Sequence, residues 1–187
     1  LADWVGKSTA LLEPLADAIG RHVLAGQAIF ADDTPVKMLD PGAGKTKETR
    51  LWVAVSGAGP PLVHFSFSTD RKQHTPIDFF EGYGGALMCD EYAGYVNVDC
   101  GDLLSCWAHA RRYVEKAQTV EPAFATEVLL EIARLYRIEE RIAKASDDER
   151  LRTRQAESRP QLEAIFSLLE SREFLPQSPM RKAAQYA

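Results

Sequence analysis

The stretch LMCDEYAGY at residues 87–95 holds the feature that decides both the fold and the chemistry of this chain. An apolar run ends directly in the carboxylate of Asp90, and a helix-like segment follows at once. The earlier stretch AIFADD at residues 28–33 repeats this arrangement and carries an apolar run to Asp32. Mg²⁺ and Mn²⁺ prefer oxygen ligands, and two such ions roughly 3.5–4 Å apart can stabilise both the attacking and the leaving oxygen of a phosphoryl transfer. The two acidic strand ends therefore predict metal-dependent cutting or joining of nucleic acid.

Within each acidic pair, the position of the apolar run decides which residue we expect to be the ligand. Asp32 and Asp90 each end their run directly, whereas Asp33 and Glu91 come one residue later and could substitute. Side chains alternate between the two faces of a strand, so each neighbour is expected to point the other way. Aspartate also commonly caps helices and turns, and that structural role is the alternative for both sites.

The composition is that of an ordinary globular protein. The chain has 187 residues, of which 45% are hydrophobic and 26% charged, enough for one substantial domain or for one domain with a helical annex. No apolar run approaches the ~20 residues of a membrane span, and the first residues lack the pattern of a signal peptide. The three cysteines form no recognisable disulfide framework. We therefore expect a cytoplasmic protein without a membrane partner.

The net charge of −5 counts against strong nonspecific binding of nucleic acid, but the basic residues are grouped. Such groups could form a local basic track beside the acidic centre, although surface lysines are usually only solvated. The candidate contacts to DNA phosphates are Lys45, Lys47, Arg71, Lys72, Arg111 and Arg112.

The order of the predicted elements indicates an α/β fold with a mixed sheet. Three strands with hairpin-like links are followed by alternating helices and strands, a pattern typical of three antiparallel strands extended by β-α-β units with helices on the sheet faces. We expect helices over residues 3–25, 75–80, 92–97 and from 107 onward, and strands over 27–32, 51–55, 62–67, 86–90 and 103–106.

From residue 122 onward the apolar residues keep helical spacing, which predicts a hairpin of two long antiparallel helices. The stretch SDDE at residues 146–149 matches a capping box that begins the second helix. The last residues, 180–187, have the pattern of a helix that is cut short. We divide the chain into an N-terminal helical segment (1–26), a core (27–120) and a helical insertion with the start of a further helix (121–187).

A Cys-x-x-His motif lies at Cys106 and His109. A structural zinc site usually needs four ligands, which Cys89 and Cys100 could complete in principle. The alternatives are a buried thiol beside a histidine in the first turn of a helix, or a histidine that contacts a phosphate near the metal centre.

Taken in order, these motifs resemble the transposases of the insertion sequence 66 family, which are bacterial DDE recombinases with an RNase H-like core. The resemblance runs through essentially the whole chain, and the blocks occur in the order of the family. The matching blocks are ADDTPV at 31–36, DPG at 40–42 with GKTK at 44–47, RLWV at 50–53, DRK at 70–72, DEYAGY at 90–95 and CWAHARR at 106–112.

The resemblance implies that Asp32 and Asp90 are the first two members of a catalytic triad that binds Mg²⁺ or Mn²⁺, with His109 near the active site. It also implies a partial RNase H-like core, DNA partners in the form of transposon ends and target, and a homo-oligomeric full-length enzyme. One departure is Asp33, which stands where the family more commonly has glutamate. The third acidic residue of the family lies beyond the helical insertion, so we expect residues 1–187 to be inactive alone.

Two other functions are consistent with the residues. A self-sufficient RNase H-like nuclease would take its third ligand from a residue such as Asp99, Asp102 or Glu115. A non-catalytic remnant would act as an assembly or inhibitory module through the hairpin at residues 122–170.

Overall fold

The computed structural model describes residues 2–90 and 92–187, and packing divides the chain into a first unit that ends at Cys106 and a second that begins at Trp107. The boundaries predicted after residues 26 and 120 follow changes in sequence pattern. The division by packing falls between them because helix α3 (Trp107–Ala117) packs on two helices of the second unit.

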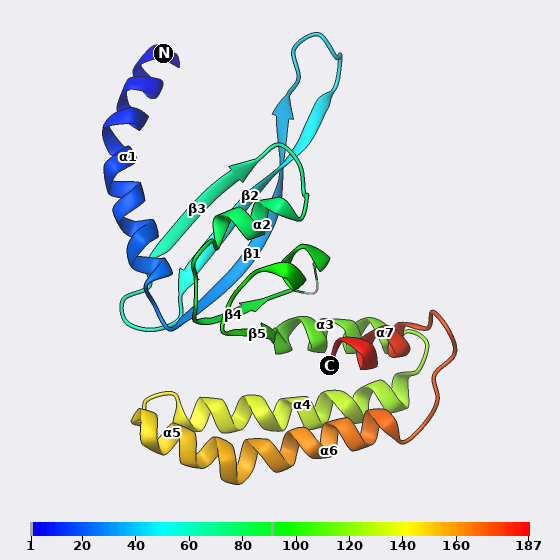
Figure 1. The fold of residues 1–187 in the computed structure, drawn as a ribbon. Helices are drawn as coiled ribbons and strands as arrows, with labels where there is room; N and C mark the ends of the chain where they lie inside the picture. Colours follow the sequence, from blue (N-terminus) through cyan, green and yellow to red (C-terminus); the bar gives the residue numbers. More distant parts are fainter. Residues whose placement is uncertain (1, 91) are drawn as a thin grey trace. The chain divides into compact units, whose positions relative to one another are not determined.

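The N-terminal helix α1 (Ala2–Leu24) agrees closely with its prediction and continues through Pro14. Only its C-terminal end is packed: Val23 is fully buried, and Gly20 lies so close to the His64 ring that an added Cβ would stand 2.8 Å from it. Most of the rest of the helix is exposed (Figure 1). The end of α1 therefore anchors the helix on the sheet of the first unit.

Five strands form one mixed sheet in the order β3-β2-β1-β4-β5. The first three strands pair antiparallel, and β4 and β5 run parallel to β1, which confirms the predicted mixed sheet. The parallel strands are reached through α2 (His74–Phe79) and a 3₁₀ helix (Ala93–Asn97). The strands are β1 (Ala28–Leu39), β2 (Thr46–Ser56), β3 (Val63–Ser68), β4 (Ala86–Cys89) and β5 (Asp102–Ser105).

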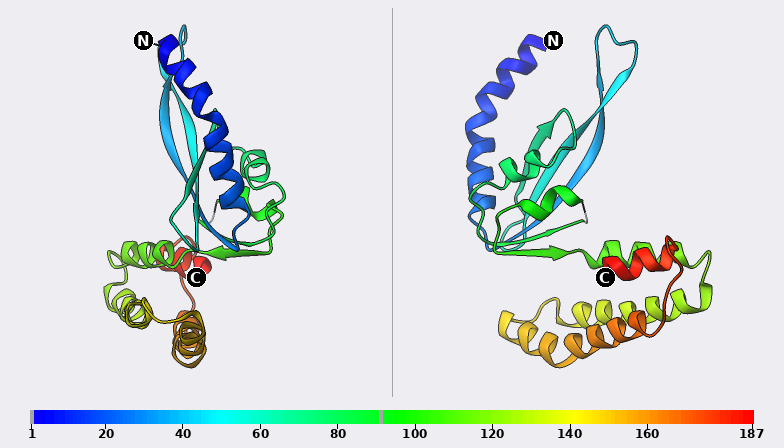
Figure 2. Two further views of the ribbon diagram at one scale, coloured as in Figure 1. Left: turned by 90° about the vertical axis from the view of Figure 1, so that its left-hand side faces the viewer. Right: turned by 45° about the vertical axis from the view of Figure 1, so that its right-hand side comes forward.

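The strand β1 is longer than predicted, and this corrects the expected place of Asp32. We predicted that the strand ends at Asp32, but it continues to Leu39 as one arm of a long hairpin with β2 (Figure 2). Pairing with β2 carries the strand past the acidic pair. Pro35 is tolerated there because β4 pairs with β1 only as far as Phe30, which leaves a free edge beyond it. Asp32 therefore lies inside a strand, whereas Asp90 directly follows β4 as predicted.

The core of the first unit lies on one face of the sheet. Cross-strand partners share a face, so the fully buried Trp52 lies on the same face as its partner Asp33. Phe80 and Tyr95, from α2 and the 3₁₀ helix, pack in the same cluster, and the rings of Trp52 and Tyr95 meet edge to face with centroids 6.1 Å apart. Phe65 lies on the opposite, exposed face. Asp33 is thus on the covered face and Asp32 on the open one.

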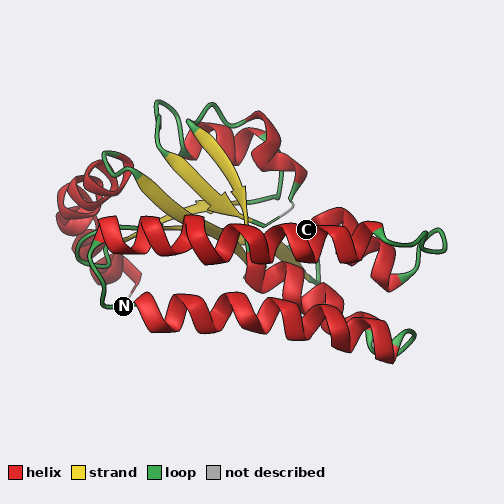
Figure 3. Cartoon of the chain, turned by 90° about the horizontal axis from the view of Figure 1, so that it is seen from below, coloured by secondary structure: helices red, strands yellow, loops and turns green. Residues whose placement is uncertain are grey.

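The described residues of the second unit form helices and connecting turns (Figure 3). The helix α4 (Pro122–Ile142) packs against a run of α5 (Asp147–Thr153), a π-helical turn (Arg154–Ser158) and α6 (Arg159–Glu170), which together form the predicted hairpin. Ser146 begins the second arm, because its hydroxyl accepts a hydrogen bond from the Glu149 amide at 3.3 Å. The last helix, α7 (Pro179–Tyr186), packs on α3. Within the described residues, every helix is too short or too polar to cross a bilayer.

Candidate metal centre

Three aspartates converge where β1 and β4 lie side by side. Asp32, Asp33 and Asp90 each contribute one carboxylate oxygen to a group whose atoms all lie within 4.8 Å of one another. The register explains the meeting: β1 and β4 are parallel, and Phe30 pairs with Met88. Asp32 and Asp90 each come two residues after that paired position, so they reach the same level of the sheet. The other candidate, Glu91, lies outside the described residues.

The carboxylate of Asp33 forms ion pairs with two arginines. Its side chain has no exposed surface. Arg71 donates to it from Nε, at 3.0 Å to each carboxylate oxygen, and from Nη2 at 2.7 Å to Oδ1. Arg50 donates from Nη1 to Oδ2 at 3.2 Å. This buried carboxylate is therefore both hydrogen-bonded and charge-compensated, as a buried ion must be.

Asp32 and Asp90 are more accessible than Asp33. Asp32 is exposed, and its Oδ1 accepts a hydrogen bond from the backbone amide of Asp33 at 2.8 Å. The Asp90 side chain keeps 24% of its surface exposed. Its Oδ1 accepts from the Tyr92 amide at 3.0 Å, so Asp90 also has the local turn role that was the alternative to metal binding. Both carboxylates thus combine a local backbone contact with access from solvent.

Arg71 links the acidic residues to the segment after β4. Its Nη2 lies 3.3 Å from Asp90 Oδ2, its guanidinium lies 4.0 Å from the centroid of the Tyr92 ring, and its carbonyl accepts from the Tyr92 hydroxyl. Burial disfavours the charged form, but the hydrogen bond from Arg71 to Asp33 and the charges of Asp33 and Asp90 outweigh it and raise the pKa of Arg71. Arg71 is therefore a permanent positive charge between two carboxylates.

The donors suit a hard cation better than zinc. Asp32 and Asp90 offer oxygen only, which matches Mg²⁺ and Mn²⁺. Burial raises the pKa of Cys89 to about 12, and the charge of Asp90 adds to this, so the thiol is protonated in the metal-free protein. Among the described residues of the first unit, the group of three candidate ligands that lie together is the aspartate cluster, which does not include Cys106. Asp99 and Asp102, two of the third ligands considered for a self-sufficient nuclease, also lie in the first unit and do not belong to this cluster. Glu115, the other one considered, lies in the second unit.

The motif residue His109 belongs to the second unit, on α3. Its Nδ1 is buried and has no hydrogen-bond partner among the described residues, and its ring lies 6.3 Å from the Tyr186 ring, centroid to centroid. Cys106 is the last residue of the first unit and is partly buried. Within α3, Arg111 is paired with Glu115 at 2.8 Å and Arg112 is exposed.

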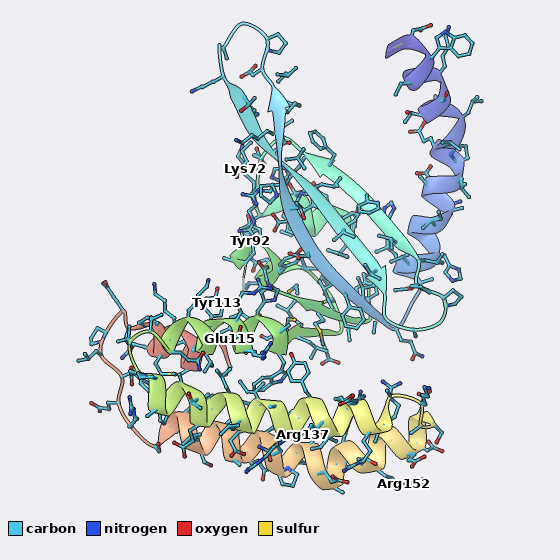
Figure 4. All side chains as sticks on the ribbon, turned by 180° about the vertical axis from the view of Figure 1, so that it is seen from behind. Lys72, Tyr92, Tyr113, Glu115, Arg137 and Arg152 are labelled. Carbon is cyan, nitrogen blue, oxygen red and sulfur yellow. The ribbon has the colours of Figure 1, made fainter. Side chains whose placement is uncertain are left out.

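The basic candidates in the first unit differ in accessibility. Lys45 and Lys47 are exposed on the β1–β2 hairpin. Lys72, which is labelled in Figure 4, is exposed and pairs with Asp70 at 3.1 Å. Arg71, in contrast, is directed to the aspartates.

The ion pair between Asp33 and Arg50 was not predicted from the sequence. The register of β1 and β2 could have indicated it: Asp33 pairs with Trp52 and Pro35 with Arg50, so Asp33 and Arg50 are diagonal neighbours on one face. The contact of Asp33 with Arg71 joins residues far apart in the chain and has no local signal.

The sheet and its acidic cluster together define an α/β protein with a candidate divalent-metal centre. The chain belongs to the IS66 transposase family, whose model, described as "Transposase IS66 family", matches residues 1–187 and confirms the resemblance of the motifs.

Three uncharacterized proteins of Sinorhizobium fredii (strain NBRC 101917 / NGR234) are similar to the chain. The protein y4qI is 30% identical over 91% of the chain, y4hP is 32% identical over 86%, and y4jD is 29% identical over 100%. The chain spans only part of these relatives, namely 35%, 33% and 40% of their lengths.

Proposed function

We propose that this chain is the catalytic-core segment of a DDE transposase that cleaves and joins DNA with Mg²⁺ or Mn²⁺ bound by Asp32 and Asp90. The observation that carries the proposal is the β1–β4 register, which brings these two carboxylates to one level of the sheet. Membership of the IS66 transposase family supports it, and so does the strand order β3-β2-β1-β4-β5, which suits an RNase H-like core.

The charges favour Asp32 over Asp33 as the ligand from β1. Two arginines already satisfy Asp33, whereas Asp32 is exposed and has one backbone contact. A ligand must offer an oxygen lone pair to the ion, and only the accessible carboxylate can do so without breaking a buried ion pair. Asp32 and Asp90 would therefore hold the ions.

The chemistry follows from this arrangement. Bound ions would stabilise the charge on the attacking and leaving oxygens of the phosphoryl transfer. Asp32 and Asp90 would fix the ions at the β1–β4 junction, while exposed basic residues would hold the DNA backbone. A third carboxylate would come from beyond residue 187, as in the family, and the complete enzyme would act on transposon ends as a homo-oligomer. His109, Arg111 and Arg112, on α3 of the second unit, are proposed to contact DNA phosphates.

A cleavage and strand-transfer assay on DNA carrying the ends of the encoding element tests the proposal. We expect Mg²⁺-dependent activity from a polypeptide that adds the third carboxylate, and little or none from residues 1–187 alone. Asp90→Asn should abolish that activity, because the amide cannot replace the anionic ligand.

Two outcomes would contradict this function. Activity of the longer polypeptide that survives Asp90→Asn would exclude Asp90 as a ligand. Strong Mg²⁺-dependent cleavage by residues 1–187 alone, lost in Asp90→Asn, would favour the self-sufficient nuclease.

The β1–β2 hairpin is the proposed DNA arm of the first unit. We expect the double substitution Lys45→Ala with Lys47→Ala to weaken DNA binding similarly for all sequences and to reduce the slope of log K against log salt concentration by about 2, since each phosphate contact contributes roughly 0.9. Fluorescence anisotropy with a labelled DNA duplex at several salt concentrations measures the DNA affinity and its dependence on salt.

A matched control is Lys7→Ala with Lys144→Ala, which removes the same charge from exposed positions elsewhere. An equal change in slope for the control would mean that only the net charge matters.

A further inference from the structure

We propose that Asp33 is a positioning residue that acts through Arg71, and that the Asp33–Arg71 pair sets how strongly Asp90 binds a metal ion. In this arrangement Asp33 is not a ligand, although it lies in the aspartate cluster. The inference rests on the proposed metal site at Asp32 and Asp90 and adds a residue pair that tunes that site.

The first observation is the difference between the two contacts of Arg71. Asp33 receives three hydrogen bonds from Nε and Nη2 at 2.7–3.0 Å, whereas Asp90 receives one from Nη2 at 3.3 Å. A forked, charge-assisted pair is the stronger contact and fixes the plane of the guanidinium. Arg71 is therefore anchored on Asp33 and reaches Asp90 only through Nη2, which also donates the shortest bond to Asp33.

The second observation is the set of other contacts that hold Arg71. The Tyr92 ring lies against the guanidinium, and the Tyr92 hydroxyl donates to the Arg71 carbonyl. Tyr92 also donates its amide to Asp90, so the three residues form a closed ring of contacts. Arg50 supports Asp33 from the other side at 3.2 Å. These contacts hold Arg71 near Asp90, so its charge stays part of the site whether or not the 3.3 Å contact is made.

The third observation is the balance of charge. Arg50 and Arg71 bring two positive charges to the three carboxylates of the cluster, although Arg50 also pairs with Glu48 outside it at 2.6 Å. A divalent ion at Asp90 would meet the positive charge of Arg71 on the Oδ2 side and would have to displace the 3.3 Å contact. The displacement would cost little, because Asp33 keeps its own bonds to Arg71. The pair would hold Asp90 oriented without an ion and release one oxygen when an ion binds.

A thermodynamic cycle on the full 187-residue chain tests the proposal. The variants are Asp33→Asn, Arg71→Gln and the double variant, which removes both charges of the pair and leaves the net charge unchanged. Asp32→Asn is the reference for the loss of a true ligand. Mn²⁺ affinity is measured from the EPR signal of the free ion at millimolar concentrations, and thermal unfolding is followed by circular dichroism without metal.

We expect Arg71→Gln to bind Mn²⁺ about 3- to 10-fold more tightly, because a positive charge near the ion is removed. Asp33→Asn should bind it more weakly by a similar factor, since Arg71 and Arg50 are then less compensated. The double variant should bind Mn²⁺ within about threefold of the original chain and melt at a higher temperature than Asp33→Asn. If Asp33→Asn alone does not fold, the Mn²⁺ affinity of the double variant still tests whether Asp33 is a ligand.

A double variant that loses Mn²⁺ binding as fully as Asp32→Asn would make Asp33 a ligand and overturn the inference. Additive melting effects in the cycle would show that Asp33 and Arg71 are not coupled and would also overturn it. If the original chain binds no Mn²⁺ while the melting effects remain coupled, the tuning of a metal site by the pair is overturned, and only the positioning of Arg71 by Asp33 stands; the cleavage assay with the longer polypeptide tests the proposed function separately.

Discussion

Asp33→Ala is expected to lower the free energy of unfolding by about 3 kcal/mol, the lower end of the cost of removing one partner from a buried ion pair. The side chain of Asp33 is completely buried, and the side chains of Arg50 and Arg71 are only 19% and 34% exposed. Loss of the Asp33 carboxylate would remove the partner that these two guanidinium groups share. Urea unfolding followed by circular dichroism measures the change.

Asp3→Ala is the matched control for this prediction. Asp3 forms an ion pair with Lys7 at 2.9 Å, but both side chains are about three-quarters exposed, at 74% and 76%. Exposed pairs contribute only ~0–1 kcal/mol, so this variant should unfold almost like the original chain. If Asp33→Ala cost no more than Asp3→Ala, the buried cluster would not hold the sheet and the loop after β3 together.

Asp32→Asn and Asp90→Asn are each expected to weaken Mn²⁺ binding by at least about tenfold, because each removes one anionic oxygen donor from a proposed site with few others. Residues 1–187 supply only these two proposed ligands, so the affinity of the original chain should itself be weak. Titration of Mn²⁺ followed by EPR measures the free ion directly.

The control for the metal titration is Asp40→Asn, which removes an exposed carboxylate from the hairpin turn outside the cluster. It should leave Mn²⁺ affinity unchanged. Equal losses in Asp40→Asn and Asp90→Asn would mean that Mn²⁺ responds to general negative charge and not to a site. If Asp32→Asn keeps its Mn²⁺ affinity while Asp90→Asn loses it, Asp32 is not the ligand from β1.

Local patterns were sufficient for the elements around Asp90. The run from Leu87 to Cys89 forms a strand, and its abrupt end places Asp90 directly after it. The order of strands and helices likewise predicted a mixed sheet, since hairpin-like links and helical crossovers allow few arrangements. The helical hairpin and the Ser146 cap were readable because apolar spacing and capping residues act within a few turns.

Local patterns were misleading around Asp32. The apolar run ends there, which indicated a strand end, but pairing with β2 extends β1 to Leu39. Hydrogen bonds to a partner strand can hold polar residues in a strand that their own propensity does not favour. The same extension places the exposed lysines of the hairpin beyond the acidic cluster.

The sequence by itself therefore determined the order of the elements, the acidic end of β4 and the family, because each depends on residues close together in the chain or on motifs that occur in the order of the family. Only the tertiary structure decided the roles within the cluster. Asp33, Arg50, Arg71 and Asp90 come from different segments, and their contacts exist only once the register of β1 with β2 and β4 is set. That register separates an accessible carboxylate at Asp32 from a buried, arginine-bound one at Asp33, although the two are adjacent in the chain.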